Sequence, residues 1–137
     1  MGELDELLDA YIYASEIFAS SYDMMGKMLD RRFIKSRVEK AGLSEVYIYG
    51  GGYLGIQLYH AVTPFVHILS VVDKSGKLLV EVPEIPVIGL DIFQSAYTQQ
   101  KVIITPVRHY KSIYAELSEF VPEDRLLYLG EFLGGRL

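Results

Sequence analysis

The sequence predicts an α/β protein built on a five-stranded parallel sheet, with a helical leader before it. From residue 46 onward, short runs of β-branched and aromatic residues alternate with helical segments. The run 65–72 is almost wholly apolar, as expected for a strand that helices cover on both faces. Residues 3–41 contain no proline and carry apolar side chains at helical spacing. Together these observations predict a parallel sheet between two helical layers, preceded by further helices.

Turn residues separate the expected elements. One helix ends before Thr63-Pro64, Asp91 is expected to cap a second, and Pro122 closes a third. The expected strands are 46–49, 65–72, 87–88, 102–105 and 126–129, and the expected helices are 53–62, 91–97 and 110–120. Because crossovers between parallel strands are right-handed, this alternation predicts the strand order 3-2-1-4-5.

The chain divides near Gly42 into a helical leader, residues 1–42, and an α/β domain, residues 43–137. Two helices are expected in the leader because side chains that can cap a helix occur in its middle, at Ser20, Ser21 and Asp23. The second helix is expected to continue through Val38 to a C-terminal cap at Gly42.

The first leader helix carries an apolar stripe formed by Leu4, Leu7, Leu8, Tyr11, Ala14 and Phe18. Methionine and aromatic side chains continue the apolar character into the second helix. An apolar stripe on a leader needs a partner to cover it. The sequence therefore predicts a homo-oligomer that forms through the N-terminal helices.

Composition excludes several classes of protein. The formal net charge of −5 argues against a general affinity for nucleic acid. Without cysteine there is no disulfide framework and no thiolate metal site. The acidic N-terminus lacks the pattern of a signal peptide, so a cytoplasmic location is expected. The stretch 46–72 lacks charged residues, but glycine, proline and histidine interrupt it. A strand, turn, helix and strand explain it better than a transmembrane segment.

The strongest motif is a G-x-G-x-x-G pattern, formed by Gly50, Gly51, Gly52, Tyr53, Leu54 and Gly55. It follows an expected strand and opens an expected helix, as a phosphate-binding turn requires. Gly50 permits the tight turn, Gly52 lets a pyrophosphate approach the backbone, and Gly55 lets helix and strand pack closely. The amides of residues 52–54 would then face the anion at the positive end of the helix. The alternative is a turn whose glycines serve packing alone.

Asp73 follows the second expected strand, where an acidic residue typically accepts hydrogen bonds from a ribose diol. The alternative is an ordinary aspartate at a strand end. Lys74 and Lys77 lie close to Asp73 in the sequence and could bind a 2′-phosphate or another anion, although surface cations are the simpler interpretation.

The loop after the fourth expected strand contains Thr105, Pro106, Arg108 and His109. In a 3-2-1-4-5 sheet this loop flanks the crevice between strands one and four. Arg108 could hold a phosphate through two hydrogen bonds, and His109 is of the residue type that titrates nearest neutral pH. Equally, both side chains could point to solvent at a helix start.

No catalytic constellation stands out. The chain contains no Gly-x-Ser-x-Gly elbow, and its histidines and carboxylates lack metal-ligand spacing. Tyr97 and Lys101 match the Tyr-x-x-x-Lys spacing of short-chain dehydrogenases, but they precede the fourth strand, where that pair does not belong. We interpret the match as coincidence and predict no catalytic residue.

The runs "VYIYGGGYLGIQLYHAV", "ILSVVDKS", "IPVIGLDIF" and "VIITPVRHYKSIYAEL" occur in the order found in small Rossmann modules of bacterial surface-polysaccharide synthesis. The chain resembles the N-terminal domain of sugar-nucleotide acetyltransferases and the nucleotide-binding domain before capsular-polysaccharide epimerase/dehydratases. The resemblance implies a nucleotide or sugar-nucleotide site at Gly50, Gly52, Gly55 and Asp73. Gly51 replaces the Ala or Ser of many relatives, and Lys74 replaces a frequent second acid.

These observations predict a Rossmann-like module that binds NAD(P) or a nucleotide-sugar and has a non-catalytic or accessory role in sugar-nucleotide metabolism. One alternative is a subunit or fragment of an NAD-dependent sugar-nucleotide epimerase or dehydrogenase. Another is a self-associating interaction domain with a vestigial site.

Overall fold

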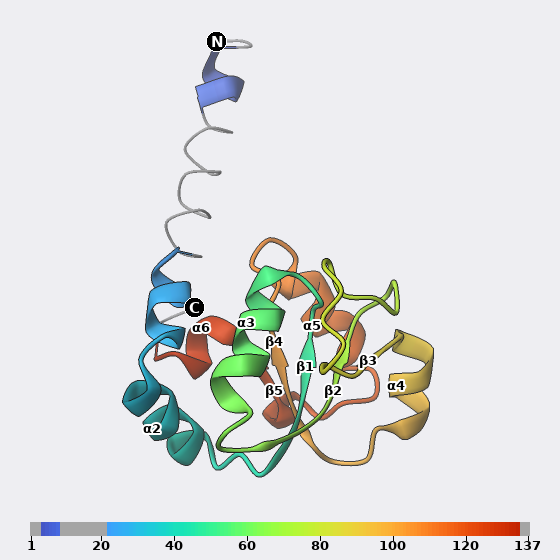
Figure 1. Cartoon of the computed structure of the whole chain (residues 1–137). Coiled ribbons are helices and arrows are strands. Elements are labelled where there is room, and N and C mark those ends of the chain that lie inside the picture. The colour runs from blue at the N-terminus through green and yellow to red at the C-terminus, as the bar shows by residue number, and fades with distance from the viewer. Residues whose placement is uncertain (1–3, 9–21, 135–137) are drawn as a thin grey trace.

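The computed structural model of the chain describes residues 4–8 and 22–134. A five-stranded parallel sheet of order β3-β2-β1-β4-β5 forms its centre (Figure 1). The strands are β1 (Glu45–Tyr49), β2 (His67–Val72), β3 (Val87–Ile88), β4 (Lys101–Ile104) and β5 (Leu126–Tyr128). The α/β class and the strand order that the sequence predicts are both confirmed.

Helices cover both faces of the sheet. The helices are α2 (Arg31–Ala41), α3 (Tyr53–Val62), α4 (Leu90–Ala96), α5 (Tyr110–Leu117) and α6 (Leu129–Phe132), with a short 3₁₀ helix, η1 (Glu123–Arg125). Side chains of β1 alternate between two cores, as the two-residue period of a strand requires. Val46 and Ile48 pack with α2, α3 and α6, whereas Tyr47 and Tyr49 pack with α4 and α5.

The uncharged stretch folds as β1, α3 and β2, as expected from the residues that interrupt it. No helix within residues 4–8 and 22–134 is long and apolar enough to cross a membrane.

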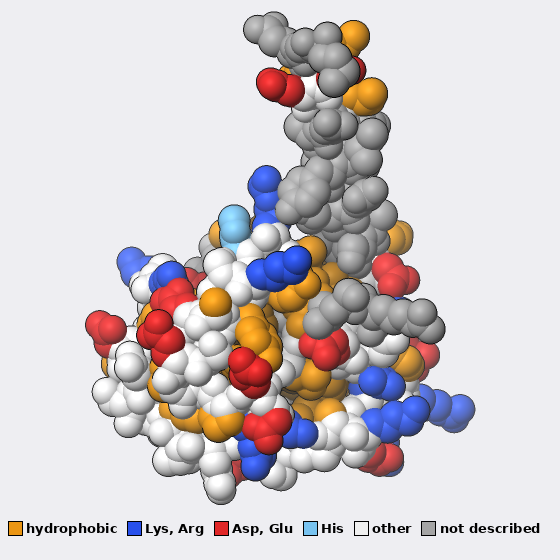
Figure 2. Space-filling view, turned by 180° about the vertical axis from the view of Figure 1, so that it is seen from behind, with side chains coloured by type: hydrophobic (Ala, Val, Ile, Leu, Met, Phe, Trp, Pro, Cys, Tyr) orange, Lys and Arg blue, Asp and Glu red, His pale blue; other side chains and the backbone are white. Residues whose placement is uncertain are grey.

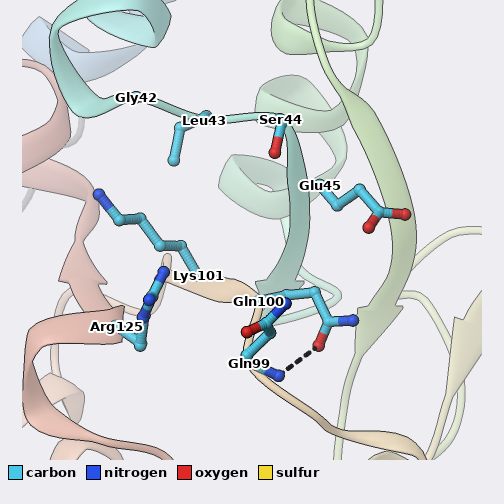
Figure 3. A pocket seen from close by; sticks show the side chains of 8 residues that line it. All are labelled: Gly42, Leu43, Ser44, Glu45, Gln99, Gln100, Lys101 and Arg125. Carbon is cyan, nitrogen blue, oxygen red and sulfur yellow. Dashed lines mark hydrogen bonds between the residues drawn. The ribbon is translucent and has the colours of Figure 1, made fainter.

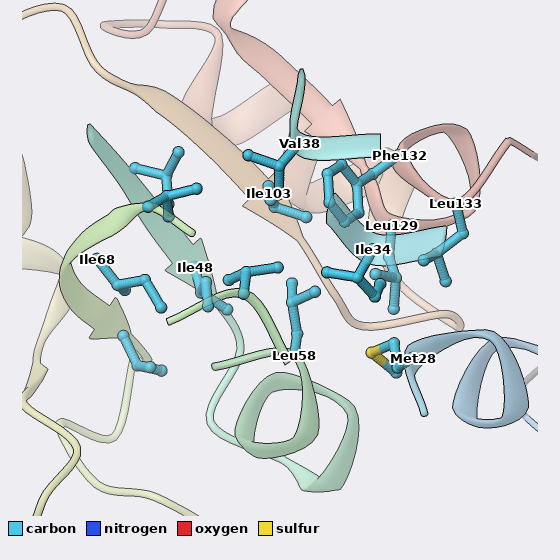
Figure 4. Packing of buried hydrophobic residues seen from close by; sticks show 14 of the residues in the cluster. Met28, Ile34, Val38, Ile48, Leu58, Ile68, Ile103, Leu129, Phe132 and Leu133 are labelled. Carbon is cyan, nitrogen blue, oxygen red and sulfur yellow. The ribbon is translucent and has the colours of Figure 1, made fainter. Parts of the chain in front are cut away.

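The first core extends into the segment that precedes the sheet. Met28, Ile34 and Val38 are buried and lie close to Leu129 and Phe132 of α6 (Figure 4). The Arg37 guanidinium adds a polar tie, because its Nε donates to the carbonyl oxygen of Phe132 at 2.6 Å. Helix α2 therefore shares one hydrophobic core with the sheet.

The predicted second leader helix is not continuous, because it is interrupted at Leu29 and Asp30. Residues 22–28 are helical, the chain turns at Leu29, and α2 begins anew at Arg31. Asp30 caps α2, since its Oδ1 accepts a hydrogen bond from the Phe33 amide at 3.1 Å. The expected cap at Gly42 is confirmed by its left-handed backbone, φ 63°. Ser20, Ser21 and the stripe residues Tyr11, Ala14 and Phe18 lie outside the described residues.

Three further expectations need correction. Gly89, not Asp91, is the N-cap of α4, and Asp91 lies in the first turn, where its charge still suits the helix dipole. Helix α5 ends at Leu117 rather than at residue 120. Helix α6 was not expected, and Leu129 belongs to it rather than to the fifth strand. Leu129 and Phe132 are buried, so packing against the first core favours this single turn of helix.

Candidate functional site

The glycine turn follows β1 directly and is fixed by its neighbours. Gly50 has φ +113°, a conformation that side-chain-bearing residues rarely adopt. Its amide donates to the carbonyl oxygen of Val72 at 2.7 Å. A Cβ at this position would overlap the Thr105 hydroxyl and lie 2.9 Å from Cδ of Pro106. Backbone conformation and space therefore both require glycine here.

Gly55 lies in the first turns of α3 and presses against the same turn. A Cβ added to Gly55 would overlap the carbonyl oxygen of Gly50 and lie 3.0 Å from its carbonyl carbon. This close approach of helix and turn is the one that the motif predicts for its third glycine. It brings the N-terminus of α3 to the carboxyl edge of the sheet.

Asp73, at the end of β2, organises the middle of the turn. Its Oδ2 accepts a hydrogen bond from the Gly51 amide at 2.9 Å, and its Oδ1 accepts from the amide and hydroxyl of Ser75 at 3.0 and 2.7 Å. Burial opposes ionisation, but the hydrogen bonds from Ser75 and Gly51 outweigh it and hold the pKa of Asp73 below its usual value. Asp73 is therefore an ionised carboxylate that ties the end of β2 to the glycine turn.

The loop after β2 also packs over this turn. The Leu79 amide donates to the carbonyl oxygen of Gly51 at 2.7 Å. A Cβ at Gly51 would lie 2.9 Å from the carbonyl oxygen of Lys77. The absence of a side chain at position 51 thus lets the loop approach closely.

The N-terminus of α3 is open. Gly52 is its N-cap, and no side chain within the described part of the chain caps the helix. A Cβ at Gly52 would meet nothing within 4 Å. Tyr53 is exposed beside it. The first amides of a helix need acceptors, and here no described side chain supplies one at the positive end of the helix dipole.

A crevice of about 320 Å³ opens beside the turn, between the carboxyl ends of the strands and α5. It is lined by Tyr49, Gly50, Asp73, Lys74, Pro106, His109, Ser112, Ile113 and Glu116. These residues come from the ends of β1 and β2, the loop after β4, and α5. The structure thus brings together five of the residues that the sequence singles out: Gly50, Asp73, Lys74, Pro106 and His109.

The other residues of the β4 loop have different surroundings. Thr105 is 2% exposed, and its hydroxyl donates to the carbonyl oxygen of Tyr49 at 2.9 Å, which joins β4 to β1. Arg108 is exposed, and His109 is the N-cap residue of α5. Lys74 pairs with Glu116 of α5, with 2.9 Å between Nζ and Oε2. Thr105 therefore shapes the turn from inside, while Lys74 borders the crevice.

Sequence reasoning missed Tyr49, Ser112, Ile113 and Glu116. The sequence could have indicated Tyr49 as a site residue, because it is the last strand residue before the turn and lies on the same face of β1 as Tyr47. Burial, then the carboxylates of Glu116 and Asp73, raise the pKa of Tyr49 to about 12. Its hydroxyl is therefore protonated at neutral pH and can donate a hydrogen bond. The three residues of α5 carried no comparable signal.

A second, smaller pocket lies at the opposite, amino end of the strands (Figure 3). Lys101 borders it, and its Nζ donates to the carbonyl oxygen of Ala41 at 2.6 Å. The Tyr97 hydroxyl donates to the carbonyl oxygen of Gln100 at 2.8 Å. Both residues of the Tyr-x-x-x-Lys match thus make hydrogen bonds to backbone carbonyls. Ligands of such sheets bind at the carboxyl ends of the strands, so this pocket is the weaker candidate.

The sheet order, the glycine turn and the open α3 N-terminus define a Rossmann-like α/β protein, a topology compatible with nucleotide binding. Comparisons with protein-family models, with curated proteins and with solved structures find no match for this chain.

Proposed function

We propose that this chain binds a nucleotide through a phosphate at the N-terminus of α3. The observation that carries the proposal is the open N-terminus at Gly52, which has no side-chain cap and lies at the carboxyl edge of a parallel sheet. Oriented amides and the helix dipole together make such a terminus favourable for an anion. NAD(P) and nucleotide-sugars are the ligand classes that we expect.

The hydrogen bonds of the turn support this assignment. The amides of Gly50 and Gly51 are already used, by Val72 and Asp73 respectively. The amides of residues 52–54 are the ones that remain to receive phosphate oxygens. Asp73 accepts three hydrogen bonds, and a carboxylate offers about four acceptor sites. It therefore has room for about one ribose hydroxyl without giving up a contact to the turn.

We further propose a non-catalytic or accessory role in bacterial sugar-nucleotide or surface-polysaccharide metabolism. The order of the sequence motifs supports this role through the resemblance that they carry. A subunit of an NAD-dependent epimerase or dehydrogenase is the alternative, and it would show turnover that depends on Arg108 or His109.

Thermal unfolding in the presence of NAD, NADP and UDP-glucose tests the binding proposal. A ligand at about one hundred times its dissociation constant stabilises the folded state by roughly 2.7 kcal/mol, which raises Tm measurably. Gly52→Val should abolish this rise because its side chain would fill the space in front of the amides. Valine is compatible with the backbone there, φ −80° and ψ −171°, so the variant should fold.

Gly26→Val is the matched control, since a Cβ at Gly26 also meets nothing within 4 Å, and Gly26 belongs neither to the glycine turn nor to α3. It should keep the ligand-dependent rise in Tm. If no ligand raises Tm, or if Gly52→Val responds like the wild type, phosphate binding at this helix is refuted.

We also propose self-association through the N-terminal helix. Leu4, Leu7 and Leu8 are 80%, 68% and 55% exposed. Hydrophobic and acidic side chains lie close together in the described segment 4–8 (Figure 2). Three exposed leucines within one turn and a half of helix need a partner surface. Light scattering should show an oligomer that the triple change of these leucines to serine converts to a monomer. A monomeric wild type at high concentration would contradict the proposal.

A further inference from the structure

Tyr49 is a buried tyrosine, 4% exposed, whose hydroxyl makes no hydrogen bond to another residue in the described part of the chain. Within the same residues, no fully enclosed side-chain oxygen lacks a partner. The Tyr49 oxygen must therefore reach accessible space, and the crevice that Tyr49 lines provides it. A buried phenol whose hydroxyl opens on a cavity is a hydrogen-bond donor without an acceptor.

The charges around the crevice limit what can enter it. Asp73 and Glu116 contribute two carboxylates, and Lys74 contributes one ammonium group, which is already paired with Glu116. An additional anion would face a net negative surrounding. The remaining lining offers hydroxyls at Tyr49 and Ser112, the imidazole of His109, and an apolar surface at Pro106 and Ile113.

We infer that this crevice binds an uncharged, hydroxyl-bearing group, such as a sugar ring, that is attached to the phosphate at Gly52. The inference rests on the proposed function, because it assigns the neighbouring part of the same ligand. Gly50 lines the crevice, and Gly52, the N-cap of α3, follows two residues later, a separation of at most about 7 Å along the chain. One sugar phosphate can therefore occupy both places.

The chemistry of the lining matches a sugar ring. The Tyr49 hydroxyl donates to a ring or hydroxyl oxygen, while the carboxylate of Glu116 accepts from sugar hydroxyls. Pro106 and Ile113 provide apolar contact for the C–H groups of the ring. The volume of about 320 Å³ lies at the lower end of the range of small-molecule pockets, about 300–1,000 Å³.

Calorimetric titration of the protein with ADP, UDP, ADP-glucose, UDP-glucose and pyrophosphate tests the inference. The glucose esters should bind more tightly than ADP and UDP, which lack the glucose. Tyr49→Phe removes the hydroxyl and keeps the ring, so it should weaken the glucose esters by about three- to tenfold, the worth of one neutral hydrogen bond. The affinities of ADP, UDP and pyrophosphate should stay unchanged.

Tyr47→Phe is the matched control, because Tyr47 is a buried tyrosine on the same face of the same strand but does not line the crevice. It should bind all five compounds as the wild type does. Charge offers a second test that does not use Tyr49. UDP-glucuronate should bind more weakly than UDP-glucose, and Glu116→Gln should reduce that difference.

The possible outcomes separate the two proposals. If the esters bind no better than the diphosphates, or if Tyr49→Phe causes no selective loss, the sugar assignment is wrong and phosphate binding stands. If Tyr49→Phe weakens ADP and UDP as much as their esters but spares pyrophosphate, the crevice holds the nucleoside and not the sugar at the other end of the diphosphate, and the inference is wrong. If none of the five compounds binds, the sugar assignment fails, and phosphate binding at Gly52 fails with it if NAD and NADP also leave Tm unchanged.

Discussion

Replacement of Gly55 by alanine is the change whose consequence the structure defines best. The added methyl group would overlap the carbonyl oxygen of Gly50 and lie 3.0 Å from its carbonyl carbon and 3.3 Å from the Thr105 hydroxyl. The Gly50 backbone is held by the hydrogen bond from its amide to Val72. Because the two closest neighbours are backbone atoms rather than flexible side chains, α3 must shift away from the turn.

Two effects of opposite sign set the magnitude. Overpacking of this kind costs about 1–3 kcal/mol, and contact with fixed backbone argues for the upper end. Alanine in a helix interior recovers about 1 kcal/mol relative to glycine. We therefore expect Gly55→Ala to lower the free energy of unfolding by about 2 kcal/mol. The same change at Gly26, where a Cβ meets nothing within 4 Å, should raise it by up to about 1 kcal/mol.

Urea unfolding at pH 7 measures both variants. With a slope of about 2 kcal/mol per molar urea, Gly55→Ala should lower the midpoint by about 1 M with the slope unchanged. Gly26→Ala should shift the midpoint upward. If Gly55→Ala is as stable as the wild type, helix α3 does not press on the turn as described, and the reasoning is refuted.

Three further predictions concern pH and packing. Because the pKa of Asp73 is lowered in the folded state, its contribution to stability is present above the unfolded value of about 3.9 and is lost as pH falls through the lower folded value. In urea unfolding from pH 6 to 2.5, the free energy of unfolding of Asp73→Asn should therefore fall less with decreasing pH than that of the wild type. An equal fall would contradict this. The pKa of Tyr49 is raised to about 12, so its contribution is present below pH 10 and is lost as pH rises toward 12. Tyr49→Phe should reduce this alkaline loss, and absorbance titration at about 295 nm should show one fewer late-titrating phenol. Phe93 is fully buried and makes edge contacts with Tyr47, Tyr97 and Phe120, so Phe93→Ala should cost about 3–5 kcal/mol, whereas a change at exposed Ile92 should cost less than about 0.5 kcal/mol.

Much of the fold could be predicted because its signals are local. The alternation of strands and helices and the right-handed crossover led to the observed strand order. The elements that deviated did so where tertiary contacts outweigh local pattern. Leu129 has the composition of a strand residue, but burial against Ile34 and Phe132 favours a helical turn at α6. Asp30 was overlooked as a cap because the apolar pattern continues on both sides of it.

The candidate site likewise has a part that local sequence predicts and a part that depends on tertiary contacts. By itself the sequence determined the glycine turn, the acid after β2 and the loop after β4, because each depends on residue type and spacing within a few positions. Only the tertiary structure decided that Tyr49 and Glu116 share a crevice, and that Asp73 and Thr105 tie strand ends to the turn. Those pairs join residues more than twenty positions apart. Their meeting depends on strand register and on how each helix crosses the sheet, which no local pattern encodes.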